Sequence, residues 1–365
     1  MRASGRKGSP PGRGVDEAAM LDAIRRAIGP GGGRRDVEVG IGDDAAVLAA
    51  PSGARLVATV DMLAEGQHFR RSGPGASDLR DIGWRALAVN LSDIAAMGAS
   101  PLWALSSLGL PTDMGPAEVE RLSGGMAGAA TEYGVAVVGG NLARTGRRLV
   151  VDVMLLGQVD RPILRGGAQA GDAVCVTGRL GAAAAGLALA RASERVRAGL
   201  GVDAEPLFEA QRRPRPRLRE AAALSGLPPG AVHAMCDVSD GLASDLSHLC
   251  GPSTGAVLWR DALPVPPSVT AAARLLGRSE RTALNWALHG GEDYELLCAI
   301  ASDAVPDARR ALAAAGGVDL HAIGRFVARS ASDPAVRVTD SPSGARLRPV
   351  PVRGWDPFRT GGRSR

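Results

Sequence analysis

The amino-acid sequence predicts a mixed α/β protein of two domains. At 365 residues the chain is long enough for two sizeable hydrophobic cores. Apolar residues at helical spacing alternate with short apolar runs that are typical of strands. Near the middle, "RGGAQAGDAVCVTGRLG" (165–181) has the turn-then-strand pattern of a new domain. We therefore expect a boundary near residues 160–165, between two domains of similar size.

In the first half, the spacing of apolar residues assigns each element in turn. The clearest helix is 79–99, in which Ile82, Leu87, Leu91 and Ile94 form one apolar stripe. The sequence predicts helices at 16–28, 79–99 and 116–134. It predicts two strands around a Gly-rich turn in 37–50, and further strands at 54–63, 101–111, 135–141 and 148–159. The first half therefore contains both strand pairs and helices.

The second half begins with the strand predicted in 165–181. The run "LGAAAAGLALA" (180–190) is shorter than the roughly 18 apolar residues of a membrane span, so we expect a buried helix there. The basic connector "QRRPRPRLRE" (211–220) and another helix lead to the acidic motif "CDVSDGL" (236–242). "GGEDYELLCAIA" (290–301) predicts a turn into a buried strand, and "AVPDARRALAAAGG" and "AIGRFV" then predict a helix and a strand.

The two ends of the chain and its cysteines indicate the compartment. Residues 1–15 are rich in Gly, Pro and Arg and have no apolar stretch, so we expect a disordered tail rather than a secretory signal, and we expect another tail at 359–365. The four cysteines are widely spaced without a C-x-x-C pair, which favours buried free thiols over disulfides or zinc. We expect a cytoplasmic protein that does not bind membranes.

The net charge of +5 is carried by arginine, because Lys7 is the only lysine. A Walker A loop and a protein-kinase site each need a lysine on the phosphates, and a Schiff base needs one as nucleophile, so these sites are excluded. The connector 211–220 is basic, but only 3% of residues are aromatic, which leaves little to stack on bases. We expect a solvated or phosphate-facing connector and no nucleic-acid partner.

Acidic residues recur in motifs that are far apart in the sequence. They are Asp43 and Asp44 in "GIGDDAAVL", Asp61 in "ATVDM", Asp93 in "NLSDIAAMGA", and Asp237 and Asp240 in "CDVSDGL". Singly, each has a local explanation, such as a turn hydrogen bond or an ion pair between Asp93 and Arg85. Together, hard oxygen donors without imidazole or thiolate favour Mg²⁺ or Mn²⁺. With the Gly-rich turns "GIGDD" and "VVGGN", they indicate nucleotide phosphates bridged by metal ions.

The ordered motifs carry a family resemblance. "GIGDDAAVL", "VDMLAEGQHF", "ALAVNLSDIAAMGASP", "VVGGN", "VSDGLASDL" and "GGEDYEL" together resemble the thiamine-monophosphate kinases, within the superfamily of aminoimidazole ribonucleotide synthetase. The resemblance covers about residues 16–358. It implies ATP-dependent phosphorylation of thiamine monophosphate to thiamine diphosphate, with several Mg²⁺ ions. ATP and thiamine monophosphate would be the ligands of the site.

The resemblance also implies the architecture. The expected fold is the two-domain aminoimidazole ribonucleotide synthetase-like fold, α/β (α+β) in class. An N-terminal ATP- and magnesium-binding domain would span 16–162, and its sheet would pair across a homodimer into a β-barrel. An α+β C-terminal domain would span 163–358, with ATP between the two domains.

Carried over position by position, the resemblance implies three sets of site residues. The implied magnesium ligands are Asp44, Thr59, Val60, Asp61, Asp93, Asn141, Asp237 and Asp240, with Val60 contributing only its backbone carbonyl. The implied ATP contacts are Gly140, Asn141, Arg165 and Ser239. The implied substrate contacts are His68, Glu292 and Trp355. The family usually has aspartate where Asn141 stands, so one formal charge is lost at that position.

The implied reaction needs no covalent nucleophile and no general base, because a phosphate monoester is already mostly dianionic at neutral pH. Positioning and charge neutralisation dominate such a transfer, and Mg²⁺ and Arg165 would supply the charge. Two alternatives stay open. One is another ATP-using enzyme of the superfamily, of the purine-precursor synthetase type, against which "GGEDYEL" counts. The other is a catalytically impaired nucleotide-binding homologue, which Asn141 alone supports.

Overall fold

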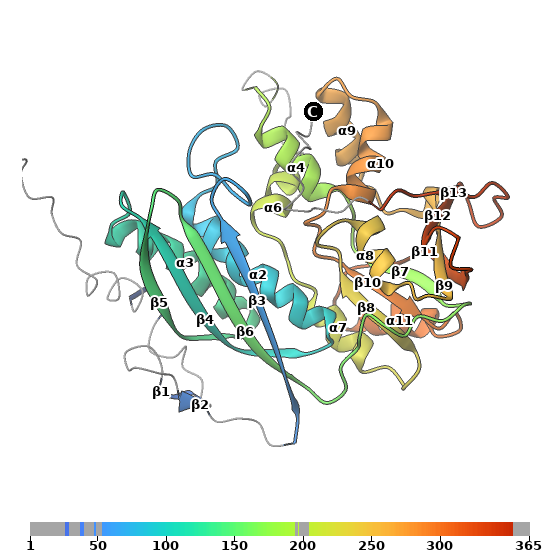
Figure 1. Cartoon of the computed structure of the whole chain (residues 1–365), viewed down its shortest axis with the longest axis horizontal. Helices are drawn as coiled ribbons and strands as arrows, with labels where there is room; N and C mark the ends of the chain where they lie inside the picture. The colour runs from blue at the N-terminus through green and yellow to red at the C-terminus, as the bar shows by residue number, and fades with distance from the viewer. Residues whose placement is uncertain are drawn as a thin grey trace, which may run out of the picture.

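A computed structural model describes residues 26–28, 37–39, 47–48, 53–193, 196 and 204–352. Two large sheets lie side by side, with the sheet of the first half at the left of Figure 1 and that of the second half at the right. A separate two-stranded ribbon pairs β1 (Val37–Val39) with β2 (Val47–Leu48). Both predicted tails, and most of the helix predicted at 16–28, lie outside the described residues.

In the first half, the strands form one sheet in the order β3-β6-β4-β5. These strands are β3 (Arg55–Ala64), β4 (Ser100–Pro111), β5 (Ala136–Gly146) and β6 (Val150–Val159). β4 and β5 are parallel because α3 (Pro116–Tyr133) carries the chain back between them, whereas β6 is antiparallel to β3 and β4. α2 (Leu79–Ala96) and α3 cover one face of this sheet, so its core lies between the helices and the strands.

In the second half, the strands form a sheet in the order β13-β12-β9-β11-β7-β10-β8. The strands are β7 (Ala173–Thr177), β8 (Val232–Asp237), β9 (Thr254–Trp259), β10 (Leu296–Ile300), β11 (Leu320–Ala328), β12 (Val336–Thr339) and β13 (Arg348–Pro349). The helices are α4 (Ala182–Ala190), α6 (Glu205–Arg212), α7 (Leu218–Ser225), α8 (Leu242–Leu249), α9 (Pro267–Leu275), α10 (Glu280–His289) and α11 (Val305–Ala314), with a short 3₁₀ turn η3 (Arg260–Ala262). Every residue of β7 and β10 is buried, because separate cores cover the two faces of the sheet.

α2 joins the two halves of the molecule. Leu87, Leu91 and Ile94 of this helix pack in the core of the first sheet. Ala95 and Ala96 pack instead in a core of the second half, which includes Met235 of β8. A helix in contact with apolar surfaces on several sides is expected to be buried nearly all round, as α2 is. Polar residues on α2 are therefore placed between the two sheets.

Glycines allow α2 and α3 to pack closely. A Cβ on Gly83 of α2 would lie 1.9 Å from the carbonyl oxygen of Leu122, and a Cβ on Gly125 of α3 would lie 1.9 Å from the carbonyl oxygen of Arg80. Both clashes are with backbone, which cannot rotate away as a side chain can. The contact between the helices therefore requires glycine at both positions.

Adjacent glycines of α3 provide a matched test of this packing. Gly125→Ala should lower the free energy of unfolding by about 1–3 kcal/mol or more, the usual cost of overpacking. Gly124→Ala should leave it unchanged or raise it by up to about 1 kcal/mol, because alanine favours helix and the nearest atom to its Cβ, Arg80 Nη1, is 3.8 Å away. Urea unfolding of both variants would measure the difference, and equal stabilities would contradict the close packing.

The predicted fold class is confirmed, with differences at the ends of elements. α2 ends at Ala96 rather than 99, because Gly98 takes a left-handed φ of 67°. β5 continues beyond the predicted residue 141 to Gly146, since it stays paired with β4 as far as Pro111. The cysteines are free thiols, as expected, and all but Cys250 are fully buried. Among the described helices, none has both the length and the apolar character required to cross a bilayer.

Candidate active site

Acidic residues of both halves meet around α2. The hydroxyl of Thr59 on β3 donates a hydrogen bond of 2.6 Å to Asp93 Oδ2 on α2. The hydroxyl of Ser92, the preceding residue, donates one of 2.8 Å to Asp237 Oδ2 at the end of β8. Ser92 and Asp93 therefore connect an edge strand of the first sheet with an edge strand of the second. We name the group formed by Asp61, Asp93, Asp237 and Asp240 the acidic cradle.

The turn after β8 is fixed by a third acid of the same motif. Asp245 Oδ2 accepts hydrogen bonds from the backbone N–H groups of Asp240, at 3.1 Å, and Gly241, at 3.0 Å. Gly241 has a φ of 120°, which favours glycine, and α8 begins directly after it. Asp245 thus orients the turn that carries Ser239 and Asp240. Sequence reasoning assigned no role to Asp245, although its position five residues after Asp240 allowed this local contact.

The carboxyl groups of the cradle destabilise one another's ionised forms. Burial raises the pKa of Asp61 to about 6, with further contributions from Asp93, Asp152 and Asp240. Burial and the neighbouring Asp93 raise the pKa of Asp237 to about 7. Burial also raises the pKa of Asp93, although the Thr59 hydroxyl and Arg165 oppose that rise. Like charges that are held together in this way favour a bound cation.

The cradle is suited to a hard cation. Its ligands are carboxylate oxygens, with the Thr59 hydroxyl beside Asp93, and oxygen ligands are those that Mg²⁺ prefers. Asp237 Oδ1 is buried and has no hydrogen-bond partner among the described residues, so it can still accept a ligand. Within the described part of the chain, no three His, Cys, Asp or Glu side chains converge closely enough to hold a metal by themselves. The residues fit Mg²⁺ ions that use one or two carboxylates and complete their shells with phosphate and water.

The residues predicted to contact ATP fall into two places. Arg165 acts electrostatically on both Asp93 and Asp237, so it lies beside the cradle, as does Ser239 in the turn between Asp237 and Asp240. Gly140 and Asn141 lie on β5, at the other edge of the first sheet. A Cβ on Gly140 would lie 1.8 Å from the carbonyl oxygen of Ser106, so this position requires glycine.

The strand register separates Asn141 from Asp61. Asn141 pairs with Ser107, which pairs with Asp152 of β6, whereas Asp61 pairs with Val153. Because side chains alternate between the faces of a sheet, Asn141 and Asp61 lie on opposite faces. Within one chain the structure therefore does not group Asn141 with Asp61. Val60, on the face opposite Asp61, has a side chain that is 59% exposed.

The predicted substrate residues His68 and Glu292 meet through Arg85 of α2. Arg85 Nη1 donates to the backbone carbonyl of His68 at 3.1 Å, and Nη2 forms an ion pair with Glu292 Oε1. His68 Nδ1 accepts the backbone N–H of Ala64 at 3.0 Å. Burial lowers the pKa of His68, and the neighbouring Arg85 lowers it further. The local alternative of an ion pair between Asp93 and Arg85 does not hold, because Arg85 pairs with Glu292.

The segment 291–294 is attached to the acidic turn. The backbone N–H of Glu292 donates to the carbonyl of Ser239 at 2.8 Å, and that of Tyr294 donates to Val238 at 2.9 Å. A Cβ on Gly291 would lie 2.6 Å from the Ser239 carbonyl oxygen, so glycine is required for this approach. The motifs "VSDG" and "GGEDYEL" thus form one local unit. The remaining predicted residues, Asp44 and Trp355, lie outside the described residues.

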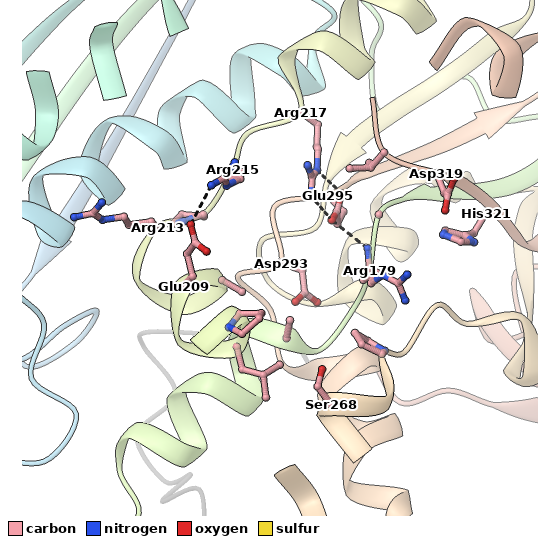
Figure 2. A pocket seen from close by; sticks show the side chains of 18 of the residues that line it. Arg179, Glu209, Arg213, Arg215, Arg217, Ser268, Asp293, Glu295, Asp319 and His321 are labelled. Carbon is pink, nitrogen blue, oxygen red and sulfur yellow. Dashed lines mark hydrogen bonds and ion pairs between the residues drawn. The ribbon is translucent and has the colours of Figure 1, made fainter. Parts of the chain in front are cut away.

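The other side of the same segment faces a cavity of about 640 Å³ (Figure 2). Glu295 there accepts a bidentate pair of hydrogen bonds from Arg217, at 2.6 and 2.7 Å, and one of 2.8 Å from the Thr177 hydroxyl. Asp293 accepts the backbone N–H of Gly181 at 2.8 Å, and burial raises its pKa to about 8. Glu292 thus pairs with Arg85, whereas Asp293 and Glu295 line this cavity.

Comparisons with known proteins agree with these features. Residues 42–159 match the family described as AIR synthase related protein, N-terminal domain, and residues 169–336 match the corresponding C-terminal domain. The thiamine-monophosphate kinase of Escherichia coli strain K12 is 37% identical over 279 residues, which cover 76% of this chain and 79% of that protein.

Solved structures show the same relationship. The thiamine-monophosphate kinase from Stenotrophomonas maltophilia K279a matches with a TM-score of 0.73 and 36% identity, over 90% of this chain and 98% of that chain. AaThiL complexed with AMPPCP and TMP matches with a TM-score of 0.69 and 28% identity, over 96% of this chain and 100% of that chain. From the shared motifs, fold and identity, the chain belongs to the thiamine-monophosphate kinase family.

Proposed function

We propose that this protein transfers the terminal phosphoryl group of ATP to thiamine monophosphate, giving ADP and thiamine diphosphate. The observation that carries the proposal is the meeting of acids from both sheets at Ser92 and Asp93, beside the cluster of His68 and Glu292. Relatives named thiamine-monophosphate kinase support the same reaction. So does a relative whose structure is a complex with TMP and the ATP analogue AMPPCP.

The chemistry follows from the charges that must approach each other. The acceptor phosphate is already mostly dianionic at neutral pH, so it needs no general base, and no protein side chain needs to act as a covalent nucleophile. Asp61, Asp93, Asp237 and Asp240 would hold several Mg²⁺ ions, with Asp44, Thr59, Val60 and Asn141 as further ligands. Bound Mg²⁺ would neutralise the repulsion between the donor and acceptor phosphates. Arg165 would add a fixed positive charge beside the cradle.

The other predicted site residues would bind either ATP or thiamine monophosphate. Gly140, Asn141, Arg165 and Ser239 would bind ATP, with Gly140 allowing a close backbone approach. His68, Glu292 and Trp355 would bind thiamine monophosphate. The N-terminal domain, 16–162, would carry most of the metal ligands, and the C-terminal domain, 163–358, would close the site. We place this reaction in the cytoplasm, where ATP and Mg²⁺ are available.

We further propose that two copies of the chain pair through the first sheet. The face opposite α2 and α3 carries exposed apolar side chains on the edge strand β3, namely Leu56, Val60 and Met62, each more than half exposed, and Met154 of β6 lies opposite Val60. Such a patch on a sheet edge is typical of a protein interface. Closing the sheet against a second copy would form the barrel expected from the family, and would cover this patch.

A charge in the middle of the patch should separate the copies. Met154→Glu is expected to turn a dimer into a monomer, because a carboxylate would be buried without a partner at the interface. Leu347→Glu is the matched control, since Leu347 is also exposed, at 45%, but lies near β13 in the other half. Sedimentation equilibrium would measure both. A monomeric wild-type protein, or a dimer that tolerates the charge at 154, would contradict the proposed interface.

The reaction itself is tested with purified protein, ATP, Mg²⁺ and thiamine monophosphate, following thiamine diphosphate by chromatography. We expect turnover of thiamine monophosphate and none of free thiamine, because thiamine lacks the anionic acceptor. Turnover of a purine precursor instead would favour a synthetase of the wider superfamily. Binding of ATP without any ADP formation would favour the impaired homologue that Asn141 suggests.

A further inference from the structure

Arg85 lies between the two predicted acceptor contacts that the structure describes. Its guanidinium donates to the His68 carbonyl and to the Glu292 carboxylate, and Tyr294 acts on it electrostatically. His68 belongs to the first half of the chain. Glu292 belongs to the second half and is 207 positions from Arg85 in the sequence. One side chain therefore ties together connecting segments from the two halves of the chain.

The segment that Arg85 holds has an unfavourable backbone conformation. Glu292 has a φ of 61° and Tyr294 a φ of 51°, both in the left-handed region that non-glycine residues seldom adopt. Such conformations are unfavourable for side chains with a Cβ, and persist only where the surroundings impose them. The backbone bonds to Ser239 and Val238 provide part of that constraint, and Arg85 provides the side-chain part.

The environment of Arg85 is unlike that of a residue kept for stability. Arg85 is only 3% exposed, and its Nε is buried without a hydrogen-bond partner among the residues described. A buried ion pair is often no more stabilising than apolar side chains of the same volume. The Glu292 side chain, in contrast, remains 30% exposed, so its carboxylate is fixed at one end and still accessible. This combination is typical of a group that orients another group toward a ligand.

We propose that Arg85 is the positioning residue of the acceptor subsite, holding the Glu292 carboxylate and the His68 segment at the fixed separation that thiamine monophosphate requires. The inference rests on the proposed function. Arg85 acts through Glu292 and His68 rather than by touching the reacting atoms. It also draws the Glu292 carboxylate toward α2, although the Glu292 backbone is bonded to the turn that carries Asp240.

Steady-state kinetics of Arg85→Met and Arg85→Lys test the role. Arg85→Met should raise the KM for thiamine monophosphate by ~10- to 100-fold, the scale expected for a misplaced binding group, and change the KM for ATP by less than about twofold. Arg85→Lys should recover part of the loss, because it restores a cation beside Glu292. Arg80→Met, at an exposed arginine of the same helix, is the control and should match the wild type. Equal rises in both KM values, or no rescue by lysine, would overturn the proposal.

A double-mutant cycle with Glu292→Gln asks whether Arg85 acts through Glu292. The double variant Arg85→Met/Glu292→Gln should be little worse than the worse single variant, whereas independent roles would multiply their effects. The same cycle measured by thermal unfolding needs no substrate. If the two substitutions are coupled in thermal unfolding but the wild type does not turn over thiamine monophosphate, the proposed function is rejected. The link from Arg85 to Glu292 is then retained. Absence of coupling in unfolding would overturn the positioning role whatever the substrate.

Discussion

Asp93→Asn is expected to lower kcat/KM for thiamine monophosphate by at least about 10²- to 10³-fold, the usual cost of losing a preorganised charge at a phosphoryl-transfer or oxyanion site. Asp93 is the acid of α2 that contacts β3, through Thr59, and acts electrostatically on Asp61 and Asp237. Asparagine keeps the shape and can still accept the Thr59 hydrogen bond. The loss would therefore report the missing charge and not a collapsed site.

The same substitution should leave the apo protein equally stable or more stable. Removing the Asp93 charge relieves the repulsion that raises the pKa of Asp61 and Asp237. Asp303→Asn is the control, because Asp303 is an exposed acid of the second half outside the cradle. Kinetics and thermal unfolding without Mg²⁺ would be measured on both variants. An active Asp93→Asn enzyme at low millimolar Mg²⁺, or a strongly destabilised one, would contradict the metal role.

The arrangement of elements could be predicted where the signal is local. The apolar stripe of α2 and the runs that became β6 and β10 are periodic in the sequence itself. Less periodic segments gave no such signal: "TGAVLW", which is β9, and the short helices α9 and α10 were not assigned. Their identity depends on burial against the second sheet, which no window of sequence contains.

The candidate site shows the same limit. The acids of the cradle were found because like-charged motifs stand out in a sequence. The contacts that organise them were not, since Ser92 and Asp237 are 145 residues apart and meet only because α2 packs on both sheets. The contacts of Asp245 could have been predicted from the sequence, because its bonds to the Asp240 and Gly241 N–H groups are local. Arg85 required the structure, since nothing near it in sequence identifies Glu292 as its partner.

The apo protein should lose stability as the pH rises from 6.5 to 8, and Mg²⁺ with an ATP analogue should remove that loss. The pKa values of Asp237 and Asp245 are raised from 3.8 to about 7, so the folded state binds more protons than the unfolded state across this range. Stability is then greatest below pH 3.8, falls as these groups ionise in the unfolded state, and stops falling once they have also ionised in the folded state, so the last part of the loss lies in this range. Below pH 6.5 the lowered pKa values of His68 and His321 act in the opposite direction, so the range above isolates the carboxyl groups.

Two aspartates separate the contribution of the cradle from that of burial alone. Asp237→Asn should flatten the pH dependence and also weaken stabilisation by Mg²⁺, because the ion binds the folded state through the carboxylate that was removed. Asp293→Asn should flatten it as well, since burial raises the pKa of Asp293 to about 8, but should keep the full response to Mg²⁺, because Asp293 faces the cavity and not the cradle. Melting temperatures at pH 6.5, 7.2 and 8, with and without 5 mM Mg²⁺ and AMPPCP, would distinguish them. If the two variants responded equally to Mg²⁺, Asp237 would not be a metal ligand, and the raised pKa there would reflect burial only.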